Sequence, residues 1–87
     1  MSEDNLKLQE YVRKAIELLC QKNFSDVVIL SSYKINSVLR EYFGVDIKVD
    51  RIGRMLANIA KKNQLKRLKT NIPKYSLKIS RLSKLKF

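Results

Sequence analysis

Residues 31–56 read SSYKINSVLREYFGVDIKVDRIGRML, and this stretch decides the fold. Two serines precede an apolar pattern of helical period that Gly44 ends, because glycine tolerates the left-handed conformation that closes helices. A short connector over residues 44–50 leads to a second apolar pattern of the same period. The stretch therefore predicts two consecutive helices joined by a connector that carries a few apolar anchors.

The first of these two helices is expected over residues 33–43, with Ser31 or Ser32 as its N-cap. Its polar positions alternate with apolar ones so that one face is free of charge. That face is predicted to pack against the core and comprises Ile35, Val38, Leu39, Tyr42 and Phe43.

The next helix is expected from Arg51 to Asn63 or Gln64, with Asp50 as its N-cap. Its core side comprises Ile52, Leu56 and Ile59, with Met55 at the edge. Gly53 lies away from the polar side, where a missing side chain lets another helix approach closely. The outer side carries five long polar or cationic side chains within an arc of about 100°; these are Arg51, Arg54, Asn58, Lys61 and Lys62.

The flanking segments complete one domain, residues 1–87, that is mostly α with a small β-hairpin. An amphipathic helix is expected over residues 6–22, capped by Ser2 or Asp4, and a short β-branched strand over residues 24–30. Two short strands around the turn Thr70-Asn71-Ile72-Pro73 predict the hairpin. The hairpin spans residues 65–79, and flexible tails are expected over residues 1–5 and 80–87.

Charge is distributed very unevenly along the chain. Residues 51–87 contain twelve lysines and arginines and no acid, whereas residues 1–50 contain seven basic and eight acidic side chains. The net charge of +11 is therefore the sum of −1 in the first part and +12 in the second. Self-repulsion destabilises a compact state, so a polyanionic partner is the simplest reason for this charge, and nucleic acid is the commonest polyanion.

Several classes of function are disfavoured. The chain has no histidine, one cysteine and no phosphate-cradling glycine loop, so we expect no enzyme, no metal site, no cofactor and no small-molecule ligand. Cys20 has apolar neighbours in a helical pattern, which predicts a buried, inert thiol. The acidic start lacks signal-peptide features, and no apolar run approaches the roughly 20 residues that span a membrane. We therefore expect an intracellular, cytoplasmic and nucleoid-associated protein.

The order helix, strand, helix, helix, hairpin resembles the winged helix-turn-helix domain over about residues 8–79. A composition rich in Lys and Ile and free of Trp is similar to that of small archaeal and archaeal-virus members. The segments that carry the resemblance are Leu30-Ser31-Ser32, then Ile35, Val38 and Leu39, then Gly44-Val45, then residues 50–56, and finally the basic hairpin.

In this family the third helix enters the DNA major groove and the hairpin, or wing, touches the backbone or minor groove. The resemblance therefore implies that Arg51, Arg54, Asn58, Lys61 and Lys62 face the groove, and arginine and asparagine do match guanine and adenine edges. The wing would contact mostly phosphates through Lys66, Arg67, Lys69, Thr70, Asn71 and Lys74. The start of the preceding helix would bind a phosphate through Ser31, Ser32, Tyr33 and Lys34.

The leading expectation is a double-stranded DNA-binding protein, either a small transcriptional regulator or a DNA-coating protein. An RNA-binding or ribosome-associated winged helix is the first alternative, because ribosomal proteins are also short, Lys-rich and His-poor. A winged-helix module that binds a protein partner is the second. A homodimer through the first helix also stays open, because many winged helices dimerise to place two reading helices one DNA turn apart.

Overall fold

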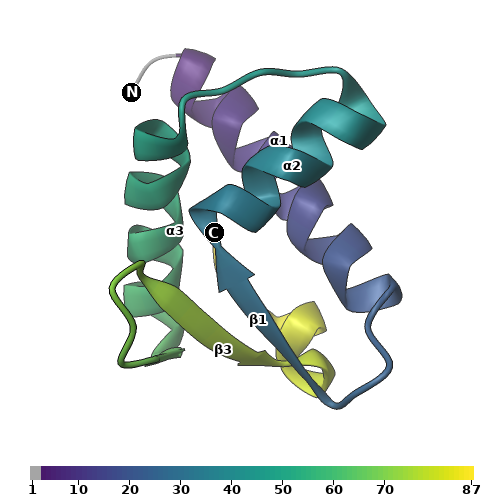
Figure 1. Cartoon of the computed structure of the whole chain (residues 1–87), viewed down its shortest axis with the longest axis vertical. Helices are drawn as coiled ribbons and strands as arrows, with labels where there is room; N and C mark the ends of the chain where they lie inside the picture. Colours follow the sequence, from purple (N-terminus) through teal and green to yellow (C-terminus); the bar gives the residue numbers. More distant parts are fainter. Residues whose placement is uncertain (1–2) are drawn as a thin grey trace.

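Three α-helices surround one apolar core in the computed structural model, which describes residues 3–87 (Figure 1). The prediction of a mostly α chain with a small hairpin is confirmed, and one 3₁₀ helix is added at the end. The elements are α1 (Glu3–Gln21), β1 (Val27–Ser31), α2 (Ser32–Phe43), α3 (Val49–Asn63), β2 (Lys66–Arg67), β3 (Lys74–Lys78) and η1 (Ile79–Lys84).

Helix α1 begins at Glu3, three residues before the predicted start, so Asp4 lies inside the helix and is not its cap. The alternative cap Ser2 and the first part of the tail expected over residues 1–5 lie outside the described residues. The buried face of α1 consists of Leu8, Val12, Ala15, Ile16 and Cys20. This face packs in the core of its own chain.

Helix α2 starts and stops where local chemistry predicts. The Ser31 side chain accepts a hydrogen bond of 3.2 Å from the backbone N–H of Lys34, which satisfies one of the free donors of the first turn. At the other end Gly44 adopts φ 63°, and its N–H donates to the Leu39 carbonyl. The serine cap and the glycine stop are therefore both confirmed.

Helix α3 begins at Val49, so the prediction that Asp50 caps it is wrong. Lys48 occupies the N-cap position without a side-chain hydrogen bond, and its carbonyl accepts from the N–H groups of Arg51 and Ile52 at 3.0 and 3.1 Å. Asp50 lies inside the first turn instead, where its charge complements the positive end of the helix dipole. Gln64 ends the helix with φ 54°.

The predicted hairpin pairs with the earlier strand to form one antiparallel sheet of order β1-β3-β2. Leu77 faces Val28 and Tyr75 faces Leu30 across β1 and β3, while Arg67 faces Tyr75 across β2 and β3. Because side chains alternate along a strand, Leu77 and Tyr75 share the side that contacts the core. The loop between β2 and β3 lies beside α3 (Figure 1).

The tail expected over residues 80–87 forms an ordered segment that returns to the core. Most of it is η1, and Leu82, Leu85 and Phe87 pack against the buried cluster. Periodicity did not reveal this packing, because the last residues depend on contacts with a helix more than twenty positions earlier.

The core follows the predicted stripes except at the end of α2. Ile35, Leu39, Ile52 and Leu56 are almost fully buried, as expected. Two predicted core residues, Tyr42 and Phe43, are instead exposed, and Phe43 packs edge-on against the ring of Tyr11. The last turn of α2 thus carries its aromatic rings on the surface beside α1.

Candidate nucleic-acid interface

One open hollow of about 610 Å³ lies where three elements meet: the start of α2, the side of α3 that carries Gly53 and Ala57, and the hairpin loop. Serine, tyrosine, arginine and asparagine side chains share it with small and apolar ones. The lining residues are Ser32, Tyr33, Val49, Asp50, Gly53, Arg54, Leu56, Ala57, Asn71, Ile72, Pro73 and Tyr75. We name this hollow the α3–wing groove, and we use the word wing for the hairpin made of β2, β3 and the loop between them.

The serine cap places the start of α2 beside Gly53 of α3. Because Ser31 starts the helix, Ser32 becomes its first residue and is 92% buried against α3. A Cβ placed on Gly53 would lie 3.8 Å from the Ser32 Cβ, which is ordinary van der Waals contact. The start of α2 does pack against α3 at Gly53, as expected, but this contact does not require a glycine, because an alanine would also fit.

Four residues predicted for binding come together in the α3–wing groove: Ser32, Tyr33, Arg54 and Asn71. They are 39 positions apart at most and come from all three elements that were expected to contact the ligand. Tyr33 is 55% exposed, and Arg54 and Asn71 are exposed as well. The structure therefore brings four of the predicted site residues to one hollow.

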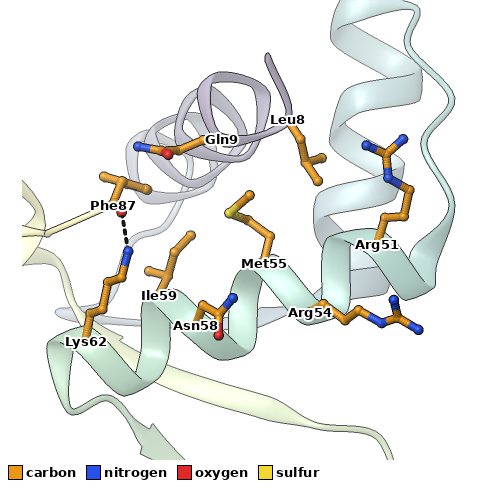
Figure 2. Close-up of a pocket in the computed structure, with 9 residues that line it drawn as sticks. All are labelled: Leu8, Gln9, Arg51, Arg54, Met55, Asn58, Ile59, Lys62 and Phe87. Atoms are coloured by element: carbon orange, nitrogen blue, oxygen red, sulfur yellow. Dashed lines mark hydrogen bonds between the residues drawn. The ribbon is translucent and has the colours of Figure 1, made fainter. Parts of the chain in front are cut away.

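Four of the five polar residues expected on one face of α3 line a second hollow, and only one of the five also lines the α3–wing groove. Arg51, Asn58 and Lys62 line this second, smaller hollow between α3 and α1, which also contains Leu8, Gln9, Met55, Ile59 and Phe87 (Figure 2). Arg54 lines both hollows. Lys61 lines neither of them and is exposed in the last turn of α3. Arg54 is therefore the residue that links the two surfaces.

Lys62 is engaged by the end of the chain. Its ammonium group donates a hydrogen bond of 2.8 Å to the backbone oxygen of Phe87, as Figure 2 shows. The Phe87 ring lies in turn 5.7 Å from the guanidinium carbon of Arg13, a distance suited to a cation–π contact. A phosphate would have to compete with the Phe87 oxygen for Lys62.

Lys34 also lies apart from the α3–wing groove. Its ammonium donates to the carbonyl of Ile29 at 3.2 Å, and its side chain lines a hollow that faces α1. The hydroxyl oxygen of Ser31 is already an acceptor for the helix cap. Of the four residues expected to hold a phosphate at the start of α2, Ser32 and Tyr33 are thus the two placed at this groove.

The wing cations lie on two sides of the sheet. Arg67 is paired with Tyr75, a groove residue, whereas Lys66 is paired with Ser76 on the opposite side. Lys74 shares that opposite side, because it is two positions from Ser76. Lys69 and Thr70 are exposed in the loop. The wing therefore offers cations along its edge and both faces.

The sequence did not predict that several further residues line the groove. These are Asp50, Gly53, Ala57, Ile72, Pro73 and Tyr75. Ala57 was overlooked because a search for long polar side chains passes over a methyl group. Ile72 could have been predicted as a surface residue of the groove, because it lies inside a turn where no apolar stripe predicts its burial.

The described residues contain no group of three or more His, Cys, Asp or Glu side chains that could hold a metal ion. Within the same part of the chain, none of the helices has the length and apolar character needed to cross a membrane. The thiol of Cys20 is buried, and desolvation raises its pKa, with a further contribution from the charge of Glu17.

No protein-family model, curated protein or solved structure matches this chain.

Proposed function

We propose that this protein is a winged helix-turn-helix protein that binds double-stranded DNA, with α3 in the major groove and the β2–β3 hairpin as its wing. The observation that carries the proposal is the α3–wing groove, where Arg54, Asn71 and the start of α2 converge. Eight of its twelve lining residues lie in the part of the chain in which twelve basic residues follow the last acid, Asp50. Asp50 is the one carboxylate among the groove residues.

The start of α2 supports binding of a phosphate. The backbone N–H groups of a helix's first turn point outward, and the helix dipole places partial positive charge there. At α2, Ser32 and the exposed Tyr33 add hydroxyl groups at the edge of the groove. A DNA strand that follows this edge would be held by the helix end, in a register that brings α3 to the bases.

The residues of α3 would make different contacts with DNA, depending on where they lie on the helix. Arg54 is exposed between the two hollows, and its planar guanidinium suits bidentate contact with guanine. Ala57 is exposed in the next turn, where a short side chain lets the helix backbone approach base edges closely. Arg51, Asn58 and Lys62 would flank this centre from the α1 side, with Lys62 weakened by its bond to Phe87.

The wing would hold the DNA backbone. Lys69 and Thr70 are exposed in its loop, and Lys66, Arg67 and Lys74 carry charge along its two strands. Because lysine acts as a flexible point charge, these contacts would neutralise phosphates without reading sequence. The wing would bind phosphates of any sequence, and α3 would contact bases. This combination fits a small regulator better than a coating protein.

The test is binding of a labelled duplex at several salt concentrations, with the mass of the complex measured in parallel. If about six phosphates are contacted, log Kobs should fall against log salt with a slope of about −5. A structured RNA of equal length, used as competitor at the same salt, should displace the duplex poorly. A flat salt response contradicts nucleic-acid binding, and stronger binding to the RNA would replace DNA by RNA as the ligand.

A further inference from the structure

The loop of the wing carries a partly exposed apolar side chain at the edge of the α3–wing groove, with cationic and polar neighbours in the sequence. Ile72 is 42% exposed, and the adjacent Pro73 is exposed too. Their neighbours along the loop are Lys69, Thr70, Asn71 and Lys74. A single exposed isoleucine is common on protein surfaces, so its exposure alone means little. Its position at the end of a basic hairpin is what requires an explanation.

The loop holds this tip in one shape. The Leu68 N–H donates to the Lys74 carbonyl at 2.8 Å and closes the base of the loop, and the Thr70 N–H donates to the Leu68 carbonyl at 3.0 Å. The Thr70 hydroxyl donates to the carbonyl of Ile72 itself. Pro73 adds a fixed φ. Ile72 is therefore presented on a constrained base, so little conformational entropy would be lost when it enters a partner.

The surroundings of Ile72 indicate which partner it fits. The side chain of Ile72 would enter an apolar space while Lys69, exposed in the same loop, meets negative charge. The DNA minor groove combines these two environments, because phosphates line its edges and stacked base faces become accessible where a step opens. Such a match of charge and apolar surface favours a duplex over an uncharged protein surface.

We propose that Ile72, backed by Pro73, is a wedge that enters the minor groove between two base pairs and partly unstacks them, which bends the duplex around the protein. This inference rests on the proposed DNA-binding function and adds a deformation to it. Side-chain wedges of this kind kink DNA by roughly 20–90° toward the major groove. Pyrimidine–purine steps open most easily, so the wedge would favour a TA or CA step beneath the wing.

The experiment uses duplexes with 2-aminopurine at a TA step and a dye at each end. When a base loses its stacking partner, 2-aminopurine fluorescence rises, and energy transfer between the dyes reports the bend. With saturating full-length protein, we expect a several-fold rise in fluorescence at one step and a shorter distance between the ends. The Ile72→Ala and Ile72→Ser variants should lose both responses while their Kd changes by only a few-fold.

Phe24→Ala is the matched control, because Phe24 is a fully exposed apolar residue in the loop between α1 and β1, away from the α3–wing groove. It should keep both responses. A wild-type protein that binds without unstacking or bending the duplex overturns the wedge and leaves DNA binding intact. The wedge is also overturned if Ile72→Ala bends DNA like the wild type. Failure of the wild type to bind any duplex would reject the proposed function together with the wedge.

Discussion

The side-chain amide of Asn63, the last residue of α3, forms two hydrogen bonds with the backbone of Lys86. Its Nδ2 donates to the Lys86 carbonyl at 2.7 Å, and its Oδ1 accepts from the Lys86 N–H at 2.8 Å. The guanidinium of Arg81 adds a bond of 2.9 Å to the Asn63 carbonyl. An asparagine that is 93% buried thus attaches the end of the chain to the end of α3.

Replacing this asparagine should release the end of the chain. In Asn63→Ala the Lys86 backbone groups lose their partner, and we expect a loss of about 1–3 kcal/mol in the free energy of unfolding. Urea unfolding measures the loss, and amide hydrogen exchange over residues 85–87 should accelerate. Asn58→Ala is the control, because Asn58 is exposed one turn earlier and should change stability by less than about 0.5 kcal/mol. Unchanged exchange in Asn63→Ala would contradict the attachment.

The two glycines should respond in opposite directions to alanine. Gly53→Ala should stabilise the protein by roughly 0.5–1 kcal/mol, because alanine favours a helix interior and its Cβ meets Ser32 at an ordinary distance. Gly44→Ala should destabilise it by about 1 kcal/mol, although the space around Gly44 is open, because its φ of 63° strains any side chain. Thermal unfolding of both variants checks this pair, and a destabilised Gly53→Ala would show that α2 and α3 lie closer than the structure places them.

Arg54 and Lys69 should differ in the way their loss affects DNA binding. Arg54→Ala should relax sequence preference at one base pair, with a change in discrimination of about 1–3 kcal/mol. Lys69→Ala should weaken binding to all sequences alike and lower the salt slope by about 1. Selection from a random duplex pool followed by titration of the winners measures both effects. Equal losses on every sequence for both variants would indicate that the protein coats DNA without reading it.

Two neighbouring lysines of α3, Lys61 and Lys62, should contribute differently to the salt dependence of DNA binding. Because the Lys62 ammonium is already bound to the Phe87 oxygen, its removal should reduce the salt slope less than removal of Lys61, which lies exposed beside it. The measurement is again log Kobs against log salt, taken for the two alanine variants on one duplex. A larger effect at Lys62 would mean that DNA displaces the end of the chain.

The buried thiol should be protected in the native protein. Burial, and secondarily Glu17, raises the pKa of Cys20, so the reactive thiolate is scarce at neutral pH. We expect slow reaction with a thiol reagent at pH 7.5 and fast reaction in denaturant. Because the folded state holds this proton more tightly, its contribution to stability is complete below the unfolded pKa of about 8.5 and declines as pH rises above it. Fast labelling of the native protein would place Cys20 at the surface.

Local rules were sufficient for most of the elements. The apolar periods of α1, α2 and α3, the Ser31 cap and the Gly44 stop all depend on residues within about one or two turns of one another, and each is found in the structure. The N-cap of α3 was predicted wrongly at Asp50, because an acid near a helix start suits both the cap and the first turn, and side-chain chemistry alone does not separate them.

The residue types of the candidate site were predictable from the sequence, but which of them line the α3–wing groove and which line the hollow beside α1 was not. The sequence located the cations on one face of α3 and on the hairpin, and it brought Arg54 and Asn71 into the same prediction. It did not show that Arg51, Asn58 and Lys62 turn toward α1, because this depends on how α1 crosses α3. It also assigned Lys34 to a phosphate, whereas the nearby β1 carbonyl takes its ammonium.

The sequence by itself determined the order of the α-helices and strands, the acid-free second part of the chain, and the serine cap and glycine stop of α2, because these follow from side-chain and backbone chemistry over a few residues. Only the tertiary structure decided that the last residues return to Asn63, that Lys62 is bound by Phe87, and that Ile72 lies at the edge of the α3–wing groove. These three features depend on contacts between distant positions, and such contacts are decided when the whole core packs.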